Sequence, residues 1–248
     1  MIFNKFFILF KIGRKIGKSN IINIVSETHK IPVFIKLFFN LLAFSFSSSN
    51  NTKSKGKENL SESIQEMGTT FIKLGQFLAT RPDIIGEKLS KELESLQDKL
   101  PPFSKKEAEK IIIENLGQSN FDDIIDLSEP IAAASIAQVH KAKIKEDNII
   151  KNVAIKVLRP NIKKIFNDEI DAIMLLAYIV ESLISKTKRL KLIEVVFLFK
   201  EITNHEMDLR FEAAAANEYA ENTKNDLGFF VPKIYWNFTS ESVLTLDW

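Results

Sequence analysis

One residue of this sequence, Lys156, has a setting in which a lysine could bind phosphate. It lies in the run Val153-Ala154-Ile155-Lys156-Val157, whose composition is typical of a strand. On a strand, Val153, Ile155 and Val157 face one side, which is purely apolar and suits a core. Lys156 shares the other side with Ala154, where its amine could point at phosphates and the alanine leaves room for a flat base. A lysine in such a strand can also be an ordinary surface residue.

The segment before this strand is rich in small residues. Protein kinases carry a Val-Ala-Ile-Lys strand downstream of a phosphate loop of the form G-x-G-x-x-G-x-V. With the last position of that loop set on Val139, the three glycine positions hold Ala132, Ala134 and Ala137. Alanine lets a backbone approach a ligand closely but tolerates positive φ less well than glycine. We therefore expect a stiffer loop over a nucleotide, with altered nucleotide preference; the alternative is an alanine-rich patch beneath a helix.

Acidic residues that could hold such a lysine lie further along the chain. A phosphate-binding lysine needs a helix glutamate to orient it through a charge-assisted hydrogen bond. Glu212 is the candidate, because it lies among alanines that favour a helix and allow it to approach a sheet closely. Glu206 is six residues earlier, about 240° away on one straight helix, and should therefore have a different partner. Asp208, four residues before Glu212, would share its face.

Lys73 and Gln76 form a further polar pair in the sequence Lys73-Leu74-Gly75-Gln76. They are three residues apart, on the polar side of a predicted helix whose apolar stripe runs from Leu60 to Leu78. Taken without context, this pair would be a solvated helix face.

Periodicity and turn signals predict the elements that position these residues. Ser104 and Glu107 form a capping box at the start of one helix, which closes at Gly117. The order of helices, strands, helices and strands predicts an α+β fold. The expected elements are a helix from Leu60 to Leu78 ended by Arg81-Pro82, helices over about 87–99 and 104–115, strand segments over 131–144 and 152–158, a helix over about 162–184, a helical stretch over about 190–222, and a hairpin over 230–238 and 242–248.

Composition excludes several kinds of site. The chain has no cysteine, so disulfides and thiolate catalysis are excluded, and its three histidines are too far apart in sequence to suggest a metal cluster.

Residues 1–57 hold ten Lys or Arg and one acidic residue, a net charge of +9, which leaves −7 for the rest of a chain whose total is +2. The apolar runs 1–10 and 31–46 are interrupted by lysine and fall short of the roughly 18 residues of a spanning helix. They predict interfacial helices on an anionic membrane surface, or helices that simply pack on the fold.

The motifs together resemble the UbiB/AarF family of atypical kinases. They are K-x-G-Q, the alanine-rich segment from Ala132 to His140, the Val-Ala-Ile-Lys strand, and E-x-D followed by R-x-E. The similarity covers about residues 58–248, with the motifs in the right order and spacing. It implies a kinase-like small lobe, an antiparallel sheet with helices, over 128–248. A helical extension over 58–127 would precede it, and a basic Phe-rich segment and linker would occupy 1–57.

The resemblance also implies a role for each motif. Members of the family bind ATP with Mg²⁺, act as atypical kinases or ATPases, and support ubiquinone biosynthesis at a membrane. Lys156 would hold the α- and β-phosphates, and Glu212 would orient it as the second catalytic residue. Lys73 and Gln76 on the extension would engage the small lobe through Glu206 and Asp208. The nucleotide would lie against Ala132, Ala133, Ala134, Ser135, Val139, Ala154 and Lys156.

The sequence departs from the family where the large lobe would begin. After Glu212 it contains no H-x-D and no D-F-G, so the catalytic Asp and Asn and the Mg²⁺ ligands are absent from these 248 residues. We therefore expect this polypeptide to be inactive by itself, as a truncated kinase or as one half of a split kinase whose large lobe is a separate polypeptide. A different class, a membrane-associated helical interaction protein without nucleotide chemistry, is the alternative. The expected location is the cytoplasmic face of the bacterial inner membrane or the cytoplasm, with no nucleic-acid partner.

Overall fold

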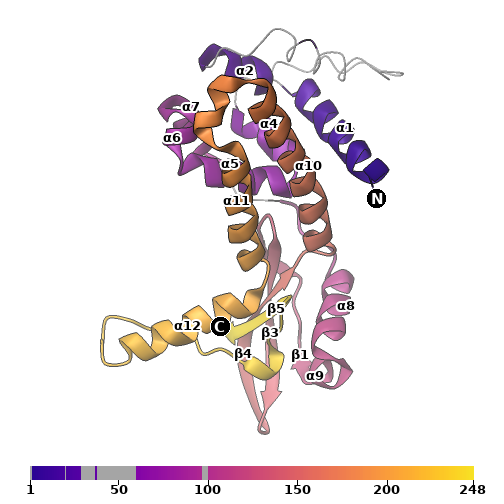
Figure 1. Ribbon diagram of the computed structural model, residues 1–248. Coiled ribbons are helices and arrows are strands. Elements are labelled where there is room, and N and C mark those ends of the chain that lie inside the picture. The colour runs from indigo at the N-terminus through magenta and orange to yellow at the C-terminus, as the bar shows by residue number, and fades with distance from the viewer. Residues whose placement is uncertain (1, 20, 29–36, 38–59, 97–99) are drawn as a thin grey trace. The chain divides into compact units, whose positions relative to one another are not determined.

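The computed structural model describes residues 2–19, 21–28, 37, 60–96 and 100–248 (Figure 1). The chain forms two compact units. The first, here the helical unit, comprises Met1–Asp98 and Lys164–Lys200; the second, the sheet unit, comprises Lys99–Lys163 and Glu201–Trp248. Of the predicted basic segment and linker over 1–57, residues 1, 20, 29–36 and 38–57 lie outside the described residues, and with them the apolar run over 31–46 apart from Leu37. The three-part division expected from the sequence stays a prediction.

The helical unit is built from amphipathic helices. Leu60, Leu89 and Leu93 form a small buried core, and Phe166 and Phe199 stack edge to face with ring centroids 5.5 Å apart. Within the described residues, no helix is both long and apolar enough to cross a bilayer. The described elements of the helical unit are α1 (Ile2–Lys18), α2 (Ile21–Thr28), α4 (Leu60–Met67), α5 (Thr69–Ala79), α6 (Pro82–Ile85), α7 (Glu87–Leu93), most of α10 (Ile162–Leu183), the 3₁₀ turn η1 (Ser185–Leu190) and the first part of α11 (Leu192–Glu206).

The prediction of one continuous helix from Leu60 to Leu78 is wrong. Gly68 adopts φ +101°, which a right-handed helix cannot include, and it separates α4 from α5. The apolar spacing continues across the break, since Met67 before it and Phe71 after it are both buried. The spacing of the apolar residues therefore could not show that the backbone turns between Met67 and Phe71.

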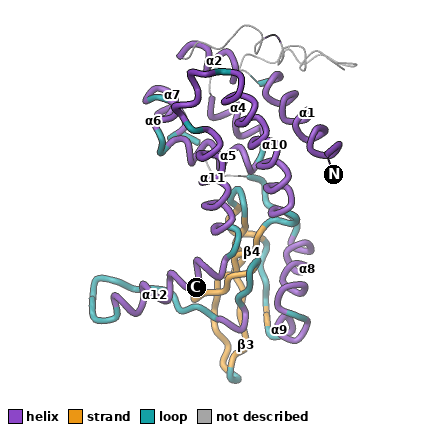
Figure 2. The backbone as a smooth tube through the Cα atoms, in the orientation of Figure 1, coloured by secondary structure: helices purple, strands orange, loops and turns teal. Residues whose placement is uncertain are grey.

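The sheet unit is built on an antiparallel sheet, so the predicted α+β fold is confirmed. The strand order is β1-β3-β4-β5, with β2 also paired to β3. Asp147 and Asn148 both have positive φ and form the two-residue turn of the long β3–β4 hairpin, which extends beyond the other strands (Figure 2). The strands are β1 (Ile124–Ile125), β2 (Pro130–Ala133), β3 (Ala137–Glu146), β4 (Ile149–Leu158) and β5 (Val243–Asp247).

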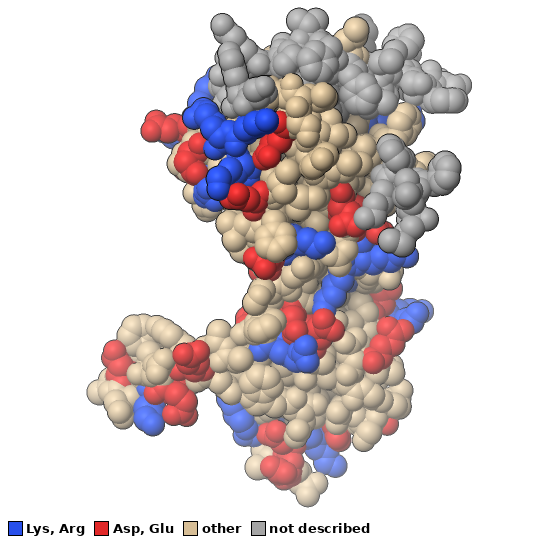
Figure 3. Space-filling view, in the orientation of Figure 1, with Lys and Arg blue, Asp and Glu red and all other residues tan. Residues whose placement is uncertain are grey.

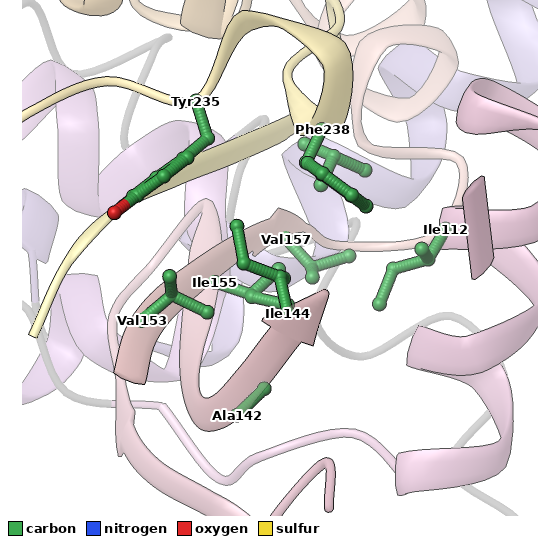
Figure 4. Packing of buried hydrophobic residues seen from close by; sticks show 9 residues of the cluster. Ile112, Ala142, Ile144, Val153, Ile155, Val157, Tyr235 and Phe238 are labelled. Atoms are coloured by element: carbon green, nitrogen blue, oxygen red, sulfur yellow. The ribbon is translucent and has the colours of Figure 1, made fainter. Parts of the chain in front are cut away.

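One face of β4 carries the core of this unit. Val153, Ile155 and Val157 are each 0% exposed, as the alternating pattern predicts (Figure 4). Ile112 packs on this face from α8 (Lys105–Leu116), and α9 (Gln118–Asp122) follows it. The predicted capping box is present, since Ser104 Oγ accepts from the Glu107 N–H and the Glu107 carboxylate accepts from the Ser104 N–H.

Two predictions for the C-terminal part of the chain are wrong. The helical stretch over 190–222 is divided, because α11 ends at Glu206 and Asp208 caps the start of α12 (Leu209–Thr223). The segment 230–238 is not a strand. In it only Ile234 bridges to β5, at Leu246, and the 3₁₀ turn η2 (Trp236–Phe238) follows. Within the described part of the chain, the segment makes only two main-chain hydrogen bonds with β5, from the Tyr235 N–H to the Thr245 carbonyl and from the Asp247 N–H to the Lys233 carbonyl. The hydroxyls of Thr239 and Thr245 then donate to the carbonyls of Tyr235 and Phe238 and stabilise the turn that follows.

Candidate functional site

The register of the sheet gathers several of the predicted site residues into one row. Ala132 pairs with Val139, Val139 pairs with Lys156, and Lys156 pairs with Leu244. Directly opposed residues in antiparallel strands point to the same face, so these four side chains lie side by side across β2, β3, β4 and β5. Ala154 is on the same face two residues from Lys156. The lysine is therefore the charged member of an otherwise small and apolar row.

Glu212 supplies the partner of this lysine. Lys156 Nζ lies 2.7 Å from Oε2 and 3.0 Å from Oε1 of the Glu212 carboxylate, across 56 positions of sequence. Glu212 is in the first turn of α12, which runs past β5 and out from the sheet (Figure 1). The Lys156 side chain is 27% exposed and that of Glu212 49%, so the pair is open to solvent and to a ligand.

The alanine-rich segment forms a tight turn at the end of this row. β2 ends at Ala133, β3 begins at Ala137, and the Ala134 N–H donates to the Ala137 carbonyl at 2.8 Å. Ser135 is 0% exposed, so it lies inside the turn and presents no surface beside Lys156. Ala133 pairs with Gln138 and is on the sheet face opposite to Ala132. The structure therefore brings Ala132, Val139, Ala154 and Lys156 together on one face, with Ala133 and Ser135 directed elsewhere.

A buried polar network supports the start of β3. The Gln138 side chain accepts from the Phe103 N–H at 2.9 Å and donates to the Phe103 carbonyl at 3.2 Å. His140 Nδ1 lies 2.8 Å from the Ser128 carbonyl, which can only accept, so this nitrogen carries the proton. His140 Nε2 then accepts from Gln138 Nε2 at 2.9 Å. Burial lowers the pKa of His140, opposed by its hydrogen bond to the Ser128 carbonyl. A neutral ring with its proton on Nδ1 satisfies both hydrogen bonds of the network.

The remaining predicted residues lie on two units. Lys73 and Gln76 are partly buried on α5 in the helical unit, whereas Glu206, at the end of α11, and Asp208 belong to the sheet unit. Their contact stays a prediction. Asp208 has a local function: its Oδ1 accepts from the Arg210 N–H at 3.1 Å, and its carboxylate pairs with the Arg210 guanidinium at 2.7 Å. The hydrogen bond from the Arg210 side chain is the main cause that lowers the pKa of the Asp208 carboxyl group.

The break before α12 also changes the geometry expected for the acidic residues. Glu206 and Glu212 are not on one straight helix, so the 240° separation does not apply. Asp208 and Glu212 do not share a helix face, because Asp208 is the N-cap residue of α12.

Sequence reasoning missed three residues that organise this site. Gln138 and His140 lie in the alanine-rich segment, where the sequence gives them no role of their own, and the same holds for Arg159, the first residue after β4. A buried polar residue inside a strand is a usable signal, since it must find a partner. The partners themselves, Phe103 and Ser128, could not be read from sequence spacing.

The described residues contain no group of three or more His, Asp or Glu side chains placed to hold a metal ion. What the site does offer is one oriented ammonium group beside a small, apolar strand surface. That donor set suits a phosphate-bearing ligand with a flat apolar part.

Comparisons with known proteins agree with the resemblance drawn from the motifs. The ABC1 atypical kinase-like domain matches residues 95–248. A protein named probable protein kinase UbiB from Marinobacter nauticus is 35% identical over 219 residues, which is 88% of this chain and 39% of that protein. The protein of the same name from Pseudomonas paraeruginosa is 31% identical over 241 residues, 96% of this chain and 44% of that protein. The chain thus spans about two fifths of the length of the curated relatives it matches.

The family predicted from the motifs, a kinase-like one related to UbiB, is confirmed by these matches, which extend beyond the motifs themselves. The chain belongs to the ABC1 atypical kinase-like family.

Proposed function

We propose that the sheet unit binds ATP through Lys156, and that the chain is part of a UbiB-like atypical kinase or ATPase that supports ubiquinone biosynthesis. The observation that carries the proposal is the ion pair between Lys156 and Glu212, with 2.7 Å between nitrogen and oxygen. An exposed ion pair stabilises a fold by only about 0–1 kcal/mol, so this one is better explained by function than by stability.

The residues beside Lys156 fit a nucleotide. Ala132 and Ala154 carry only a methyl group, so a flat base can approach the strands closely. ATP, when bound, supplies the phosphoryl group for transfer. Lys156 would hold the α- and β-phosphates, and Glu212 would keep the ammonium group directed at them. Mg²⁺ is expected in the intact family, and the part of the chain that the structure describes contains no group of three or more His, Asp or Glu side chains that could hold it.

Competition for acylation of Lys156 tests nucleotide binding. The amine of Lys156 is labelled with an acylating reagent in the presence and absence of ATP, and the rate is followed by mass spectrometry. We expect saturating ATP to slow labelling of Lys156 about ten-fold or more, with no change at Lys151 on the same strand. Glu212→Gln should weaken this protection, because the ammonium group loses its orienting charge.

Equal labelling of Lys156 with and without ATP would favour the alternative, an interaction protein without nucleotide chemistry. In the same preparation we expect no ATP hydrolysis, because the 248 residues lack the catalytic Asp and Asn and the D-F-G aspartate. Saturable hydrolysis that Lys156→Ala abolishes would contradict this part of the proposal. Hydrolysis that appears only when a second polypeptide co-purifies would identify a separate large lobe.

We further propose that the basic front end lies on an anionic membrane, at the cytoplasmic face of the bacterial inner membrane. On α1, Ile12 is 1% exposed, whereas Phe7 is 67% and Phe10 40% exposed. An apolar, lysine-flanked helix face of this kind suits the interface of an anionic bilayer. Nucleic acid is a poorer partner, because the front end is rich in Phe and other apolar residues. Elsewhere, on the face seen in Figure 3, the described Lys and Arg side chains are mixed with Asp and Glu and form no continuous basic surface.

A further inference from the structure

Arg159, the first residue after β4, holds the alanine-rich turn by its backbone and by its side chain. Its guanidinium directs two donors at one acceptor, with Nε 3.0 Å and Nη2 2.8 Å from the carbonyl oxygen of Ala134. Its backbone N–H donates to the carbonyl of Ile136 at 2.8 Å. The carbonyls on both sides of Ser135 are therefore fixed by the same arginine.

The guanidinium also ties the turn to a second segment of the sheet unit. Nη1 donates to the carbonyl of Pro101 at 3.0 Å and Nη2 to that of Leu100 at 3.3 Å. The group lies 5.8 Å from the ring centroid of Phe103, whose N–H and carbonyl are both bonded to the Gln138 side chain. Arg159 and Gln138 thus join the two ends of the turn to the residues that lead into α8.

This arrangement decides what conformational freedom the turn has. A peptide unit is planar, so fixing the direction of the Ala134 carbonyl also fixes the direction of the Ser135 N–H. Arginine suits this function because its donors lie in one rigid plane and can serve three carbonyls at once, which a lysine ammonium on a flexible stem cannot do in the same geometry. The turn is ordered when the chain folds, so a ligand that meets it does not have to order it.

We propose that Arg159 is a positioning residue for the nucleotide: it clamps the turn Ala134–Ala137 in one conformation at the end of β4, where Ala137 pairs with Leu158, two residues from Lys156. The proposal rests on the proposed nucleotide binding. Alanine has less conformational freedom than glycine, so an alanine-rich turn cannot readily adapt its shape to a ligand. The hydrogen bonds from Arg159 set the shape of the turn instead.

Two measurements on the purified chain test the clamp. Hydrogen exchange of the amides at 134–137 is measured without nucleotide, and the dissociation constant for ATP is taken from protection of Lys156. For Arg159→Ala and Arg159→Lys we expect exchange at these amides at least about ten-fold faster and an ATP dissociation constant about ten-fold higher. Exchange in the rest of the β3–β4 hairpin, over residues 140–155, should be unchanged. Arg189→Ala, at an exposed position of η1, is the matched control and should alter neither quantity.

Arg159→Lys distinguishes positioning of the turn from electrostatic attraction of phosphate. The variant keeps the positive charge but loses the planar set of guanidinium donors. Full recovery of ATP affinity in Arg159→Lys would overturn the proposal, as would unchanged exchange at 134–137 or unchanged affinity in Arg159→Ala. If Arg159→Ala does not fold, Arg159→Gln replaces it under the same criteria. Absence of protection in the wild-type chain would overturn the proposed function and the nucleotide-positioning proposal together, and the exchange data would still show whether the turn is clamped.

Discussion

At the scale of single residues, the site depends on a few polar side chains whose partners lie far away in sequence. Lys156 and Glu212 are 56 positions apart and still meet at 2.7 Å. Gln138, 1% exposed, satisfies both main-chain groups of Phe103, 35 positions away. Because a buried amide such as that of Gln138 costs free energy when it is unpaired, its hydrogen bonds strongly disfavour alternative packings of the turn and the first strands.

The buried His140 predicts a pH dependence of stability. Its pKa is lowered in the folded chain, mainly by burial, from the ordinary value of 6.5. Stability is therefore full above pH 6.5 and decreases as the pH falls below it, since the unfolded state binds the proton more readily. The slope from this group is at most about 1.4 kcal/mol per pH unit. Protonation would also place two donors, Nε2–H of His140 and the Gln138 amide, against each other.

Urea unfolding at pH 7.5 and pH 5.5 measures this effect. In His140→Asn the difference in unfolding free energy between the two pH values should shrink. His205→Asn, at an exposed position in the same unit, should leave the difference as in the wild type. An identical pH dependence in all three chains would show that His140 is not the group responsible.

At the scale of elements, close packing of α5 against α4 and the segment after α7 explains Gly75, the glycine of the K-x-G-Q motif. A Cβ placed there would lie 2.7 Å from Leu96 Cδ2 and 3.3 Å from Ile64 Cγ2. Gly75→Ala gains about 1 kcal/mol in helix propensity but incurs an overpacking cost of about 1–3 kcal/mol. We expect a net destabilisation of about 1 kcal/mol.

A double-mutant cycle with Leu96 tests this explanation. In a Leu96→Ala background the obstructing methyl is gone, so Gly75→Ala should become neutral or stabilising by about 0.5–1 kcal/mol. The free energy of unfolding is measured for both single variants and the double variant. Additive effects of the two substitutions would mean that the contact with Leu96 is not the reason why position 75 holds a glycine.

The α12 element depends on its cap as well as on its alanines. Asp208 accepts from the Arg210 N–H and begins the helix whose first turn carries Glu212. Of the residues in α12 only Leu209 and Ala213 are buried, so tertiary packing fixes just its first turns. The helix start, not its length, therefore positions the partner of Lys156.

At the scale of the whole molecule, the charge distribution predicts where the chain binds. Residues 1–57 carry +9 and the remainder −7, so an anionic surface attracts the front end and repels the body. The Debye length shortens as salt is added, and the attraction should weaken with it.

Vesicle flotation tests this prediction. The chain should float with vesicles of phosphatidylglycerol and phosphatidylethanolamine at low salt, and less so at about 0.5 M salt. The double variant Phe7→Ser with Phe10→Ser should float less. Phe230→Ser, which alters an 85% exposed residue of the sheet unit, is the matched control and should float as the wild type does. Equal flotation of all three chains, or none with anionic vesicles, would contradict a membrane-binding role for α1.

The sequence alone determined those features that depend on local or alternating patterns. The core face of β4, the capping box of α8 and the α+β fold follow from residue spacing and from hydrogen bonds between near neighbours. The family also followed from the sequence, since four motifs in one order are far more specific than any of them alone.

Tertiary structure alone decided the breaks and the partners. Gly68 and Asp208 interrupt runs that read as continuous helices, because apolar spacing continues across a turn in the backbone. The turn that Arg159 clamps and the network of Gln138 and His140 join residues 12 to 59 positions apart. Hydrogen bonds between residues so far apart in sequence leave no periodic signal, and only the folding of the sheet unit as a whole brings their donors to their acceptors.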